Sequence, residues 1–327
     1  MTDPKQAHDA LFKKTFSVVE HAAAEFRAVL PAPLLALTDF STLTLCAGSY
    51  VDEALAGSQS DLLFSVEVSG KPALLYVLFE HQSSADKLMP LRLLRYIVRI
   101  LERHVDDAKT PSEALPLPMV IPVVLHHSEG SWTVARRVEE LFDAELVKAA
   151  GAAELIPRLS FVLDDLSHLT DEELEGRALG LVPVLTLWAL RDARSPERLA
   201  KSLGHWVRTM AELLHAPNGR EALWTLFRYI GAVADDSMTE TLTAVLEAAE
   251  PEVKDALMTI AEKWEAKGRA EGKAEGKAEA LRKQLTQKFG ALPEATTRRI
   301  ASASEVELDR WLERVLTADT LDAVISR

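Results

Sequence analysis

The sequence contains little cysteine, no excess of basic residues and no long apolar run. Cys46 is the only cysteine among 327 residues, so the chain can form neither an internal disulfide nor a cysteine-based zinc site. Oxygen atoms would therefore have to hold any metal ion. No apolar run approaches the length that a bilayer-spanning helix needs, and the opening residues lack the apolar core of a secretory signal. We expect a cytoplasmic protein without membrane contact.

The net charge is −13 at pH 7, with 50 acidic and 37 basic side chains. Proteins that bind nucleic acid through its phosphates usually carry a basic excess, so the whole-chain balance does not favour such a partner. The local distribution of charge therefore has to show whether any part of the chain could contact nucleic acid. Hydrophobic residues make up 48% of the chain, which is enough for a sizeable core. Because 327 residues exceed a typical domain, we expect two structured parts.

The stretch from Leu74 to Gln82 is apolar up to Phe79 and then becomes polar. It has no helical period and follows a Ser-Gly-Lys-Pro turn signal, which predicts a buried central strand that ends near Glu80. Because side chains alternate along a strand, Glu80 and Gln82 would project to one face and His81 to the other.

The residues from Ser60 to Val68 predict another strand, with Asp61 at its start. The turn between Ser69 and Pro72 is short enough to join both strands in a hairpin. We therefore expect Asp61 and Glu80 to converge at one edge of the sheet. A carboxylate at the end of a buried strand is costly unless something pairs with it, and a metal ion is one such partner. The spacing of the two acids alone fits an ordinary charged hairpin end at least as well as it fits a metal site.

Elements on either side of the hairpin extend this α/β pattern. Residues 7–30 have the spacing of an amphipathic helix, and Leu43 to Cys46 predict a first strand. After the hairpin, Met119 to His127 predict a strand in which Pro122 favours an edge position or a bulge. A helix from Ser131 through Phe142 and a strand from Arg158 to Asp165 would follow.

A helix predicted from about Lys87 to Val105 carries a stripe of basic residues. Spacings of three and four residues put its arginines on one side of the helix: Arg92, Arg95, Arg99 and Arg103. Asp86 and Glu102 are the only acids between Asp86 and Val105. Solvated helix faces usually mix charges of both signs, so the stripe favours contacts with phosphate groups over simple solvation.

The second half of the chain has a helical pattern without a motif for chemistry. Helices are predicted at residues 171–192, 196–215, 220–233, 238–250 and 252–264. Residues 267–278 then repeat a four-residue unit of Gly, a basic residue, Ala and Glu. Three glycines would cost a helix about 3 kcal/mol in total, which predicts a marginal helix or a flexible linker.

The end of the chain predicts a small helical unit. One helix stops at Gly290, and Ser304 with Glu307 forms a capping box before the next apolar run. We therefore expect a chain of four parts: an α/β domain at 1–170, a helical region at 171–266, a linker at 267–278 and a C-terminal helical domain at 279–327.

Four short motifs occur along the first part of the chain, namely His8–Lys14, Ser60–Leu63, Phe79–Ser84 and Leu91–Tyr96. In this order they resemble the recombination-promoting nuclease family, whose members are also described as transposase-like, within the PD-(D/E)XK nuclease superfamily. The resemblance implies a restriction-endonuclease-like core, which is a mixed sheet flanked by helices. It also implies an endonuclease that needs Mg²⁺ or Mn²⁺, acts on DNA and is linked to recombination or mobile elements.

The resemblance also implies roles for individual residues. Asp61 and Glu80 would be the metal ligands, together with the backbone carbonyl of His81. Gln82 stands where the superfamily usually has lysine, and its neutral amide can orient water but cannot take a proton. DNA would be the partner, with its backbone contacted by Lys13 and by the arginine stripe.

Several alternatives stay open at the level of the sequence. The nuclease fold could be catalytically degenerate and act as a DNA-binding or assembly module, or the helical half could inhibit it until a partner binds. The C-terminal helices are candidates for contacts within a homo-oligomer. His126 and His127 favour a structural role because no third ligand is evident, and Asp9 and Glu25 favour solvated positions on a helix surface.

Overall fold

The computed structural model describes residues 4–46, 62–80, 86–110, 112–128, 130–233, 273, 276–290, 292–301, 303–318 and 320–325. The chain forms two compact units. Thr2–Lys254 make up the first, and Asp255–Arg327 with Met1 make up the second. No helix in the described ranges is both long and apolar enough to cross a membrane.

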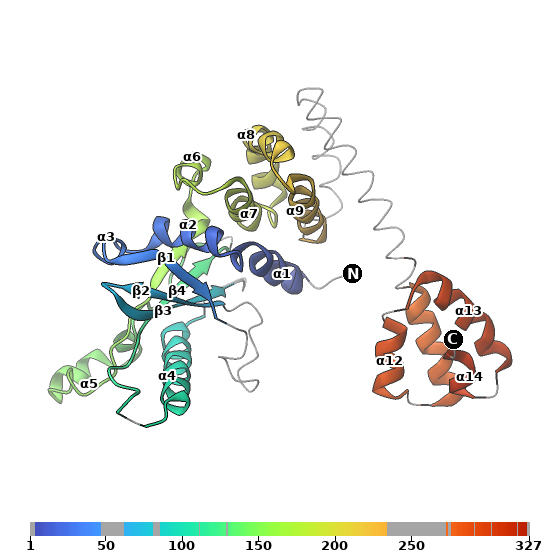
Figure 1. Cartoon of the computed structure of the whole chain (residues 1–327), viewed down its shortest axis with the longest axis horizontal. Helices are drawn as coiled ribbons and strands as arrows, with labels where there is room; N and C mark the ends of the chain where they lie inside the picture. Colours follow the sequence, from blue (N-terminus) through green and yellow to red (C-terminus); the bar gives the residue numbers. More distant parts are fainter. Residues whose placement is uncertain are drawn as a thin grey trace. The chain divides into compact units, whose positions relative to one another are not determined.

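A mixed sheet lies at the centre of the first unit (Figure 1). Its five strands lie side by side in chain order: β1 (Thr38–Leu45), β2 (Leu62–Val68), β3 (Lys71–Glu80), β4 (Met119–His126) and β5 (Val162–Asp165). The strands β1, β2 and β3 are antiparallel neighbours, whereas β3, β4 and β5 run parallel. This confirms the predicted α/β class, with the mixed sheet that a restriction-endonuclease-like core requires.

The hairpin of β2 and β3 is confirmed in the described residues. Ser69 and Gly70 form its two-residue turn, with φ angles of 51° and 70°. Two successive residues with positive φ are typical of a type I′ turn, whose twist matches that of the strands. Val68 pairs with Lys71, and the register continues without interruption to the pair of Leu62 with Val77.

Helices cover both faces of the sheet (Figure 1). On one face lies α4 (Met89–Asp107), whose buried residues recur every three or four positions and share a core with Leu63 and Tyr76. On the other face lie α1 (Pro4–Phe16) and α2 (Val19–Val29), where the rings of Phe26 and Phe64 meet at 5.5 Å. Leu63 and Phe64 thus point to opposite faces, as neighbours in a strand do.

The single helix predicted over residues 7–30 is broken between α1 and α2. Val18 is extended, with φ −77° and ψ 117°, and begins a new helix instead of continuing the first. The break has a packing reason. It lets α2 lie on the sheet while α1 packs against α7 and α9.

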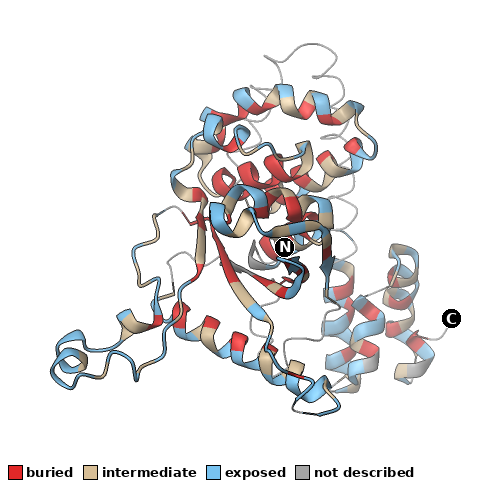
Figure 2. Cartoon of the chain, turned by 60° about the vertical axis from the view of Figure 1, so that its left-hand side comes forward, coloured by how far each residue is buried: buried red, intermediate tan, exposed pale blue. Residues whose placement is uncertain are grey.

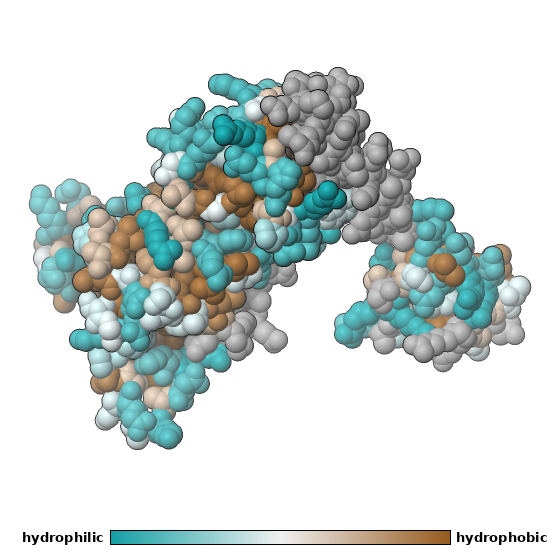
Figure 3. Space-filling view, turned by 45° about the horizontal axis from the view of Figure 1, so that its top comes forward, coloured by the Kyte–Doolittle hydropathy of each residue, from teal (hydrophilic) through white to brown (hydrophobic). Residues whose placement is uncertain are grey.

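Within the described residues 171–233 the chain forms four α-helices: α6 (Asp171–Glu175), α7 (Leu181–Asp192), α8 (Pro196–His215) and α9 (Gly219–Val233). Nearly all of α7 is buried, and its Trp188 stacks on Trp206 of α8 at 6.1 Å. Figure 2 shows the buried residues along the inner sides of these helices. On the face drawn in Figure 3, hydrophobic residues gather over the middle of the first unit and hydrophilic residues lie around them.

The predicted helices of this region agree with the described ones, with one exception. Residues 196–215 and 220–233 are helical as expected. The helix predicted over 171–192 is interrupted between α6 and α7, where Gly176 and Gly180 flank Ala178 with a φ of 53°. The helices predicted at 238–250 and 252–264 lie outside the described residues.

The connection between β4 and β5 corrects a prediction. Among the described residues of this connection, the regular elements are η2 (Val138–Leu141) and α5 (Ala144–Ala149), so the helix expected from Ser131 through Phe142 is wrong. Backbone N–H groups in this segment donate hydrogen bonds to residues distant in sequence, not to carbonyls one helical turn earlier. The N–H of Trp132 donates to Asp165 at 2.9 Å, and the N–H of Val138 donates to the Leu159 carbonyl at 2.9 Å.

The edge position expected for β4 is also wrong, because β4 lies between β3 and β5. Pro122 is tolerated there for a reason visible in the register. Val123 is the first residue of β4 that has a partner in β5, so the missing N–H of Pro122 falls just before that ladder. The remaining short elements are α3 (Ala32–Leu35) and η3 (Leu166–His168).

The second unit is a small bundle with its own core. Residues 276–289 are helical and are followed by α12 (Glu294–Ala301), α13 (Glu305–Thr317) and α14 (Leu321–Ile325). Leu281, Leu285 and Trp311 are among its buried residues. The predicted stop at Gly290 is confirmed by a φ of 82°, and the predicted capping box of Ser304 and Glu307 is present. Of the repeat at 267–278, only Lys273 and residues 276–278 are described, and these are helical.

Candidate active site

The carboxyl ends of the three parallel strands meet at one edge of the sheet. In their register Glu80 pairs with His126, and His126 pairs with Asp165. Each of these residues is the last of its strand. Because open α/β sheets bind ligands outside the carboxyl ends of parallel strands, this edge is the candidate active site.

Of the predicted catalytic residues, the structure describes only the backbone of Glu80, at the end of β3. Asp61, His81 and Gln82 lie outside the described residues. The pair of Leu62 with Val77 fixes the register of the hairpin up to this point. The convergence of Asp61 with Glu80 therefore stays a prediction.

His126 occupies the middle of this edge in an unusual environment. Its side chain is fully buried, and its Nε2 lies 2.8 Å from Ser128 Oγ and 3.2 Å from the Gly130 carbonyl oxygen. Ser128 Oγ donates its own proton to that carbonyl at 2.6 Å, so it must accept a proton from Nε2. The hydrogen bonds thus assign the proton of the neutral ring to Nε2.

The other ring nitrogen of His126 is left with an unshared lone pair. Nδ1 is buried and has no hydrogen-bond partner in the described part of the chain. Burial lowers the pKa of His126, although the Gly130 carbonyl and the Asp165 carboxylate oppose this shift, so the ring stays neutral at pH 7. Buried polar atoms without partners are rare and call for an explanation, such as catalysis or a bound ion.

Asp165 organises the loops around His126. One of its oxygens accepts from the backbone N–H of Trp132 at 2.9 Å, and the other accepts from the Ser167 hydroxyl at 2.6 Å. These bonds lower the pKa of Asp165 against the opposing effect of burial, which is the largest single influence. The Trp132 ring lies edge-on to His126 at 5.2 Å. Asp165 therefore fixes the position of Trp132, against whose ring His126 packs.

His127 points away from this edge, toward the face that α1 covers. Its Nδ1 donates to the Leu190 carbonyl at 2.9 Å, and its ring lies 4.9 Å from that of His8. His126 and His127 therefore point to opposite faces of the sheet and cannot hold one ion together. For His127 the predicted structural role is confirmed. His8 is itself buried and bonded to Tyr229 at 2.7 Å, so the first family motif begins in the core.

The predicted arginine stripe lies on α4, where three of its members meet acids of the same helix or of the residues just before it. Arg92 lies 3.9 Å from Asp86, Arg99 lies 3.4 Å from Glu102, and Arg103 lies 3.6 Å from Asp107. Arg95 is exposed. The Arg99 and Glu102 side chains are 54% and 56% exposed, and ion pairs between exposed side chains contribute little free energy, so this pair would yield readily to a phosphate group. Arg92 is only 23% exposed and also donates to the Tyr96 hydroxyl at 3.3 Å.

Lys13 does not join the stripe. It lies half-buried on α1, which covers the face of the sheet opposite α4. Its neighbour Lys14 bonds to Glu221 at 3.2 Å and to Thr225 at 2.8 Å and so ties α1 to α9. The structure therefore separates the basic residues that the sequence grouped as contacts to the DNA backbone.

A buried network of charges was missed at the level of the sequence. Glu25 and Asp9 are 7% and 8% exposed, so the solvated positions expected for them are wrong. The Arg177 guanidinium donates to Glu25 at 3.0 Å and to both oxygens of Asp164, at 3.0 and 2.5 Å. A signal did exist, because Glu25 interrupts the apolar side of α2 between Ala22 and Phe26.

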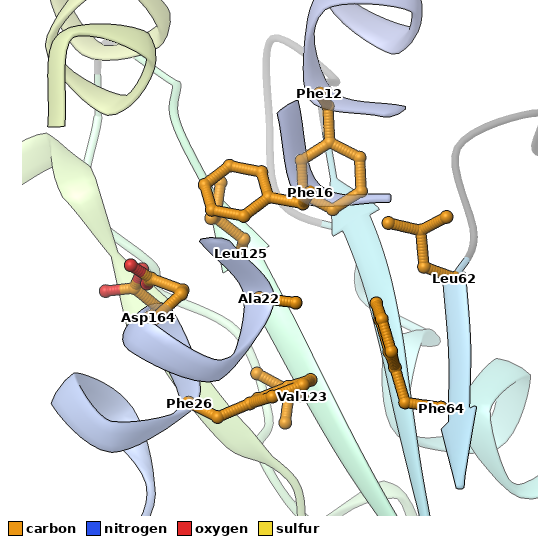
Figure 4. A pocket seen from close by; sticks show the side chains of 10 residues that line it. Phe12, Phe16, Ala22, Phe26, Leu62, Phe64, Val123, Leu125 and Asp164 are labelled. Carbon is orange, nitrogen blue, oxygen red and sulfur yellow. The ribbon is translucent and has the colours of Figure 1, made fainter. Parts of the chain in front are cut away.

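This network borders a small apolar cavity. Its walls are mainly aromatic and aliphatic, with the carboxyl group of Asp164 at one end (Figure 4). Glu25 also lines the cavity. The cavity measures about 20 Å³, which is room for one water molecule. Burial is the main reason that the pKa of Glu25 is raised well above its ordinary value of 4.5, with the Asp164 carboxylate adding to the effect and Arg177 opposing it.

The raised pKa of Glu25 makes stability depend on pH. Between pH 4.5 and the raised pKa the folded chain keeps a proton that the unfolded chain has lost, so stability falls as pH rises. We expect Glu25→Gln to remove this dependence and to gain stability over the wild type by up to about 1.4 kcal/mol per pH unit. Urea unfolding from pH 5 to 8 measures it. Glu20→Gln, at an exposed position of the same helix, should leave the pH dependence of stability unchanged. A Glu25→Gln chain whose stability changes with pH in parallel with the wild type would contradict the prediction.

Comparisons with known proteins assign the chain to a family. A family model described as "Putative transposase, YhgA-like" matches residues 6–221. The recombination-promoting nuclease RpnA of Escherichia coli (strain K12) is 32% identical over 268 residues, which cover 80% of this chain and 84% of RpnA. The inactive recombination-promoting nuclease-like protein RpnE of the same strain is 30% identical over 270 residues, covering 80% of this chain and 82% of RpnE.

A further relative matches over a shorter stretch of the chain. The recombination-promoting nuclease RpnC of Escherichia coli (strain K12) is 36% identical over 124 residues, which cover 38% of this chain and 40% of RpnC. No solved structure matches the chain. The extent of the family match and the similarity to RpnA over most of both chains show that the protein belongs to the YhgA-like family, which includes recombination-promoting nucleases.

Proposed function

We propose that this protein is a metal-dependent DNA endonuclease that hydrolyses phosphodiester bonds in DNA recombination or in mobile elements. The observation that carries the proposal is the end of β3. Glu80 ends the second strand of a regular hairpin and pairs with β4 at the carboxyl edge of the parallel strands, in a chain similar to a named nuclease over most of its length.

Carboxylate and carbonyl oxygens would hold the ion, which we propose to be Mg²⁺ or Mn²⁺. Asp61 and Glu80 supply the carboxylates, and the backbone of His81 supplies the carbonyl. Gln82 orients the attacking water through its amide. When bound, the ion would stabilise charge on the phosphate and activate water. In the described part of the chain, the register partner of Glu80 is His126, whose Nδ1 is buried without a hydrogen-bond partner.

Cleavage of supercoiled plasmid tests the proposal. We expect the purified chain to nick the plasmid with Mg²⁺ or Mn²⁺ and to stop when EDTA removes the ion. Asp61→Ala should abolish nicking and exclude a contaminating nuclease. Nicking that survives EDTA, or that the variant retains, would contradict the metal-dependent mechanism.

DNA would lie along α4, with the arginine stripe as its backbone clamp. We expect Arg95→Gln with Arg99→Gln to weaken duplex binding and to reduce the slope of log Kd against log salt by about 1.8, since each phosphate contact contributes about 0.9 for B-DNA. Fluorescence anisotropy at several salt concentrations measures this slope. Arg208→Gln with Arg228→Gln removes the same charge from exposed sites on α8 and α9. Equal slopes in the two double variants would contradict the clamp.

A second function is favoured by two observations. Gln82 replaces the usual lysine, and relatives named inactive are among those similar to this chain. The chain could then bind DNA or assemble with partners without cutting. Retention of DNA with no nicking at any metal concentration would support this function over the endonuclease.

A further inference from the structure

A pocket of about 390 Å³ lies among the helices that surround α1, which packs beside α7 and α9 (Figure 1). These three helices form most of its wall, and the end of α8 and the start of α2 complete it. All of its lining residues are described and belong to the first unit. Ligand pockets in proteins usually measure about 300–1,000 Å³, so this one has room for a small molecule.

The inner wall of the pocket is apolar and held in place. Leu11, Leu185 and Leu226 line it, and each is at most 4% exposed. The hydroxyls of Thr15 and Thr186, also buried, lie 3.0 Å apart and join α1 to α7. Because this bond and the packed leucines fix the helices, the pocket needs no rearrangement before a ligand enters.

Two polar groups of the pocket have hydrogen-bonding capacity to spare. Of the Thr15 and Thr186 hydroxyls one donates to the other, so the second proton is left over, and neither hydroxyl makes a further hydrogen bond among the described residues. His21 Nδ1 donates to the Thr15 carbonyl at 2.9 Å, so Nε2 of the neutral ring is an acceptor. Both groups meet at Thr15, and the pocket therefore offers one donor and one acceptor in the same place.

The charges at the mouth of the pocket cancel. Lys14 and Glu221, the two oppositely charged side chains of the lining, pair at 3.2 Å and are 54% and 71% exposed. Lys14 also donates to Thr225 at 2.8 Å. A charged ligand would have to separate this pair or enter the apolar part without a partner, which is costly. The pocket therefore suits a molecule without net charge.

We propose that this pocket binds an uncharged small molecule that has an apolar body and one hydroxyl group, such as a phenol or an alcohol. The body would lie against the leucines and cover Val18, which is 39% exposed at the pocket. The hydroxyl would donate to His21 Nε2 and accept the spare proton of the threonine pair. The pocket lies among helices and not at the carboxyl edge of the strands, so the inference does not rest on the proposed function.

Compounds of matched shape test the ligand class on the wild-type full chain. We expect 4-ethylphenol to shift the methyl NMR signals of Val182, Leu185 and Leu226, with a Kd on the order of 1 mM or tighter. Ethylbenzene should bind about tenfold more weakly because it cannot form the hydrogen bonds, and the anion 4-ethylbenzoate should also bind more weakly. Absence of 4-ethylphenol binding, shifts confined to other methyl groups, or tighter binding of either other compound would overturn the proposal.

Substitution of both threonines tests the hydrogen bonds. Valine has nearly the shape of threonine, and replacing both partners of a buried hydrogen bond leaves neither one unpaired. We expect Thr15→Val with Thr186→Val to weaken 4-ethylphenol binding about fivefold, the value of one hydrogen bond, and to leave ethylbenzene binding unchanged. A double variant that still prefers 4-ethylphenol as strongly as the wild type does would refute the assigned contacts.

Filling the pocket tests its position. Ala222 lines the pocket from α9, so Ala222→Phe should place a ring inside it and abolish binding of both 4-ethylphenol and ethylbenzene. Ala211→Phe is the matched control, because Ala211 is half-buried on α8 and does not line the pocket. Unchanged binding in Ala222→Phe, or equal losses in the two variants, would overturn the proposal.

Discussion

Glu80→Gln is expected to reduce metal-dependent plasmid nicking by about 10³-fold, and Asp61→Asn should do the same. An amide oxygen carries no net charge, so either change would weaken the hold on an ion that contributes several kcal/mol of transition-state stabilisation. Each 1.4 kcal/mol of that loss is about tenfold in rate. The rate of nicking under single-turnover conditions, at saturating Mg²⁺ and Mn²⁺, measures the effect.

The double variant gives a sharper test than either change alone. If both side chains hold one ion, Asp61→Asn with Glu80→Gln should be little slower than each single variant, because residues that act as a unit are not additive. Glu67→Gln is the matched control, since Glu67 is an exposed glutamate on β2 of the same hairpin. Losses that simply multiply, or a Glu80→Gln variant within tenfold of the wild type, would refute the shared ion.

The parts of the fold that could be predicted from the sequence are those with local causes. The turn at Ser69 and Gly70 needs positive φ angles, and only a few residue types supply them readily. The apolar period of α4 and the capping box at Ser304 and Glu307 are likewise set by residues a few positions apart. These local patterns predict that the elements exist without any information on how they pack.

The parts that could not be predicted depend on contacts between distant residues. Arg177 and Glu25 are 152 positions apart, and no periodicity links them. The segment after Ser131 avoids a helix because the Leu159 carbonyl, 21 positions beyond Val138, accepts a backbone N–H that a helix would have used. Tertiary hydrogen bonds here outweigh a local apolar pattern.

The same limit applies to the candidate site. From the sequence, His126 had no partner that would make it a ligand. Only the parallel register of β3 and β4 makes it a neighbour of Glu80, and only the fold shows which of its nitrogens is free of a proton. The sequence could propose the carboxylates from a hairpin, which is local, but not the position of His126, which lies on a strand that crosses back after α4.

Arg177→Met is expected to destabilise the first unit by about 3–5 kcal/mol, the loss typical of a buried ion pair with one partner removed. The guanidinium makes three hydrogen bonds to Glu25 and Asp164, and the three side chains are only 14%, 10% and 3% exposed. Methionine fills similar volume but leaves two carboxyl groups buried without a cation. Urea unfolding at pH 7.5 measures the loss.

If Arg177 stabilises the fold by its charge, two further results are expected that packing of its side chain alone would not give. In the Arg177→Met chain, neutral amides at the two acids should restore most of the lost stability, because Glu25→Gln and Asp164→Asn remove the buried negative charge. The deficit of Arg177→Met should also shrink as pH falls, because burial raises the pKa of Glu25 and the folded chain takes up this proton before the unfolded chain does. Arg158→Met, which breaks an exposed pair with Glu154, should change little. A deficit that neither the amides nor low pH reduces would show that Arg177 stabilises the fold by packing its side chain and not by its charge.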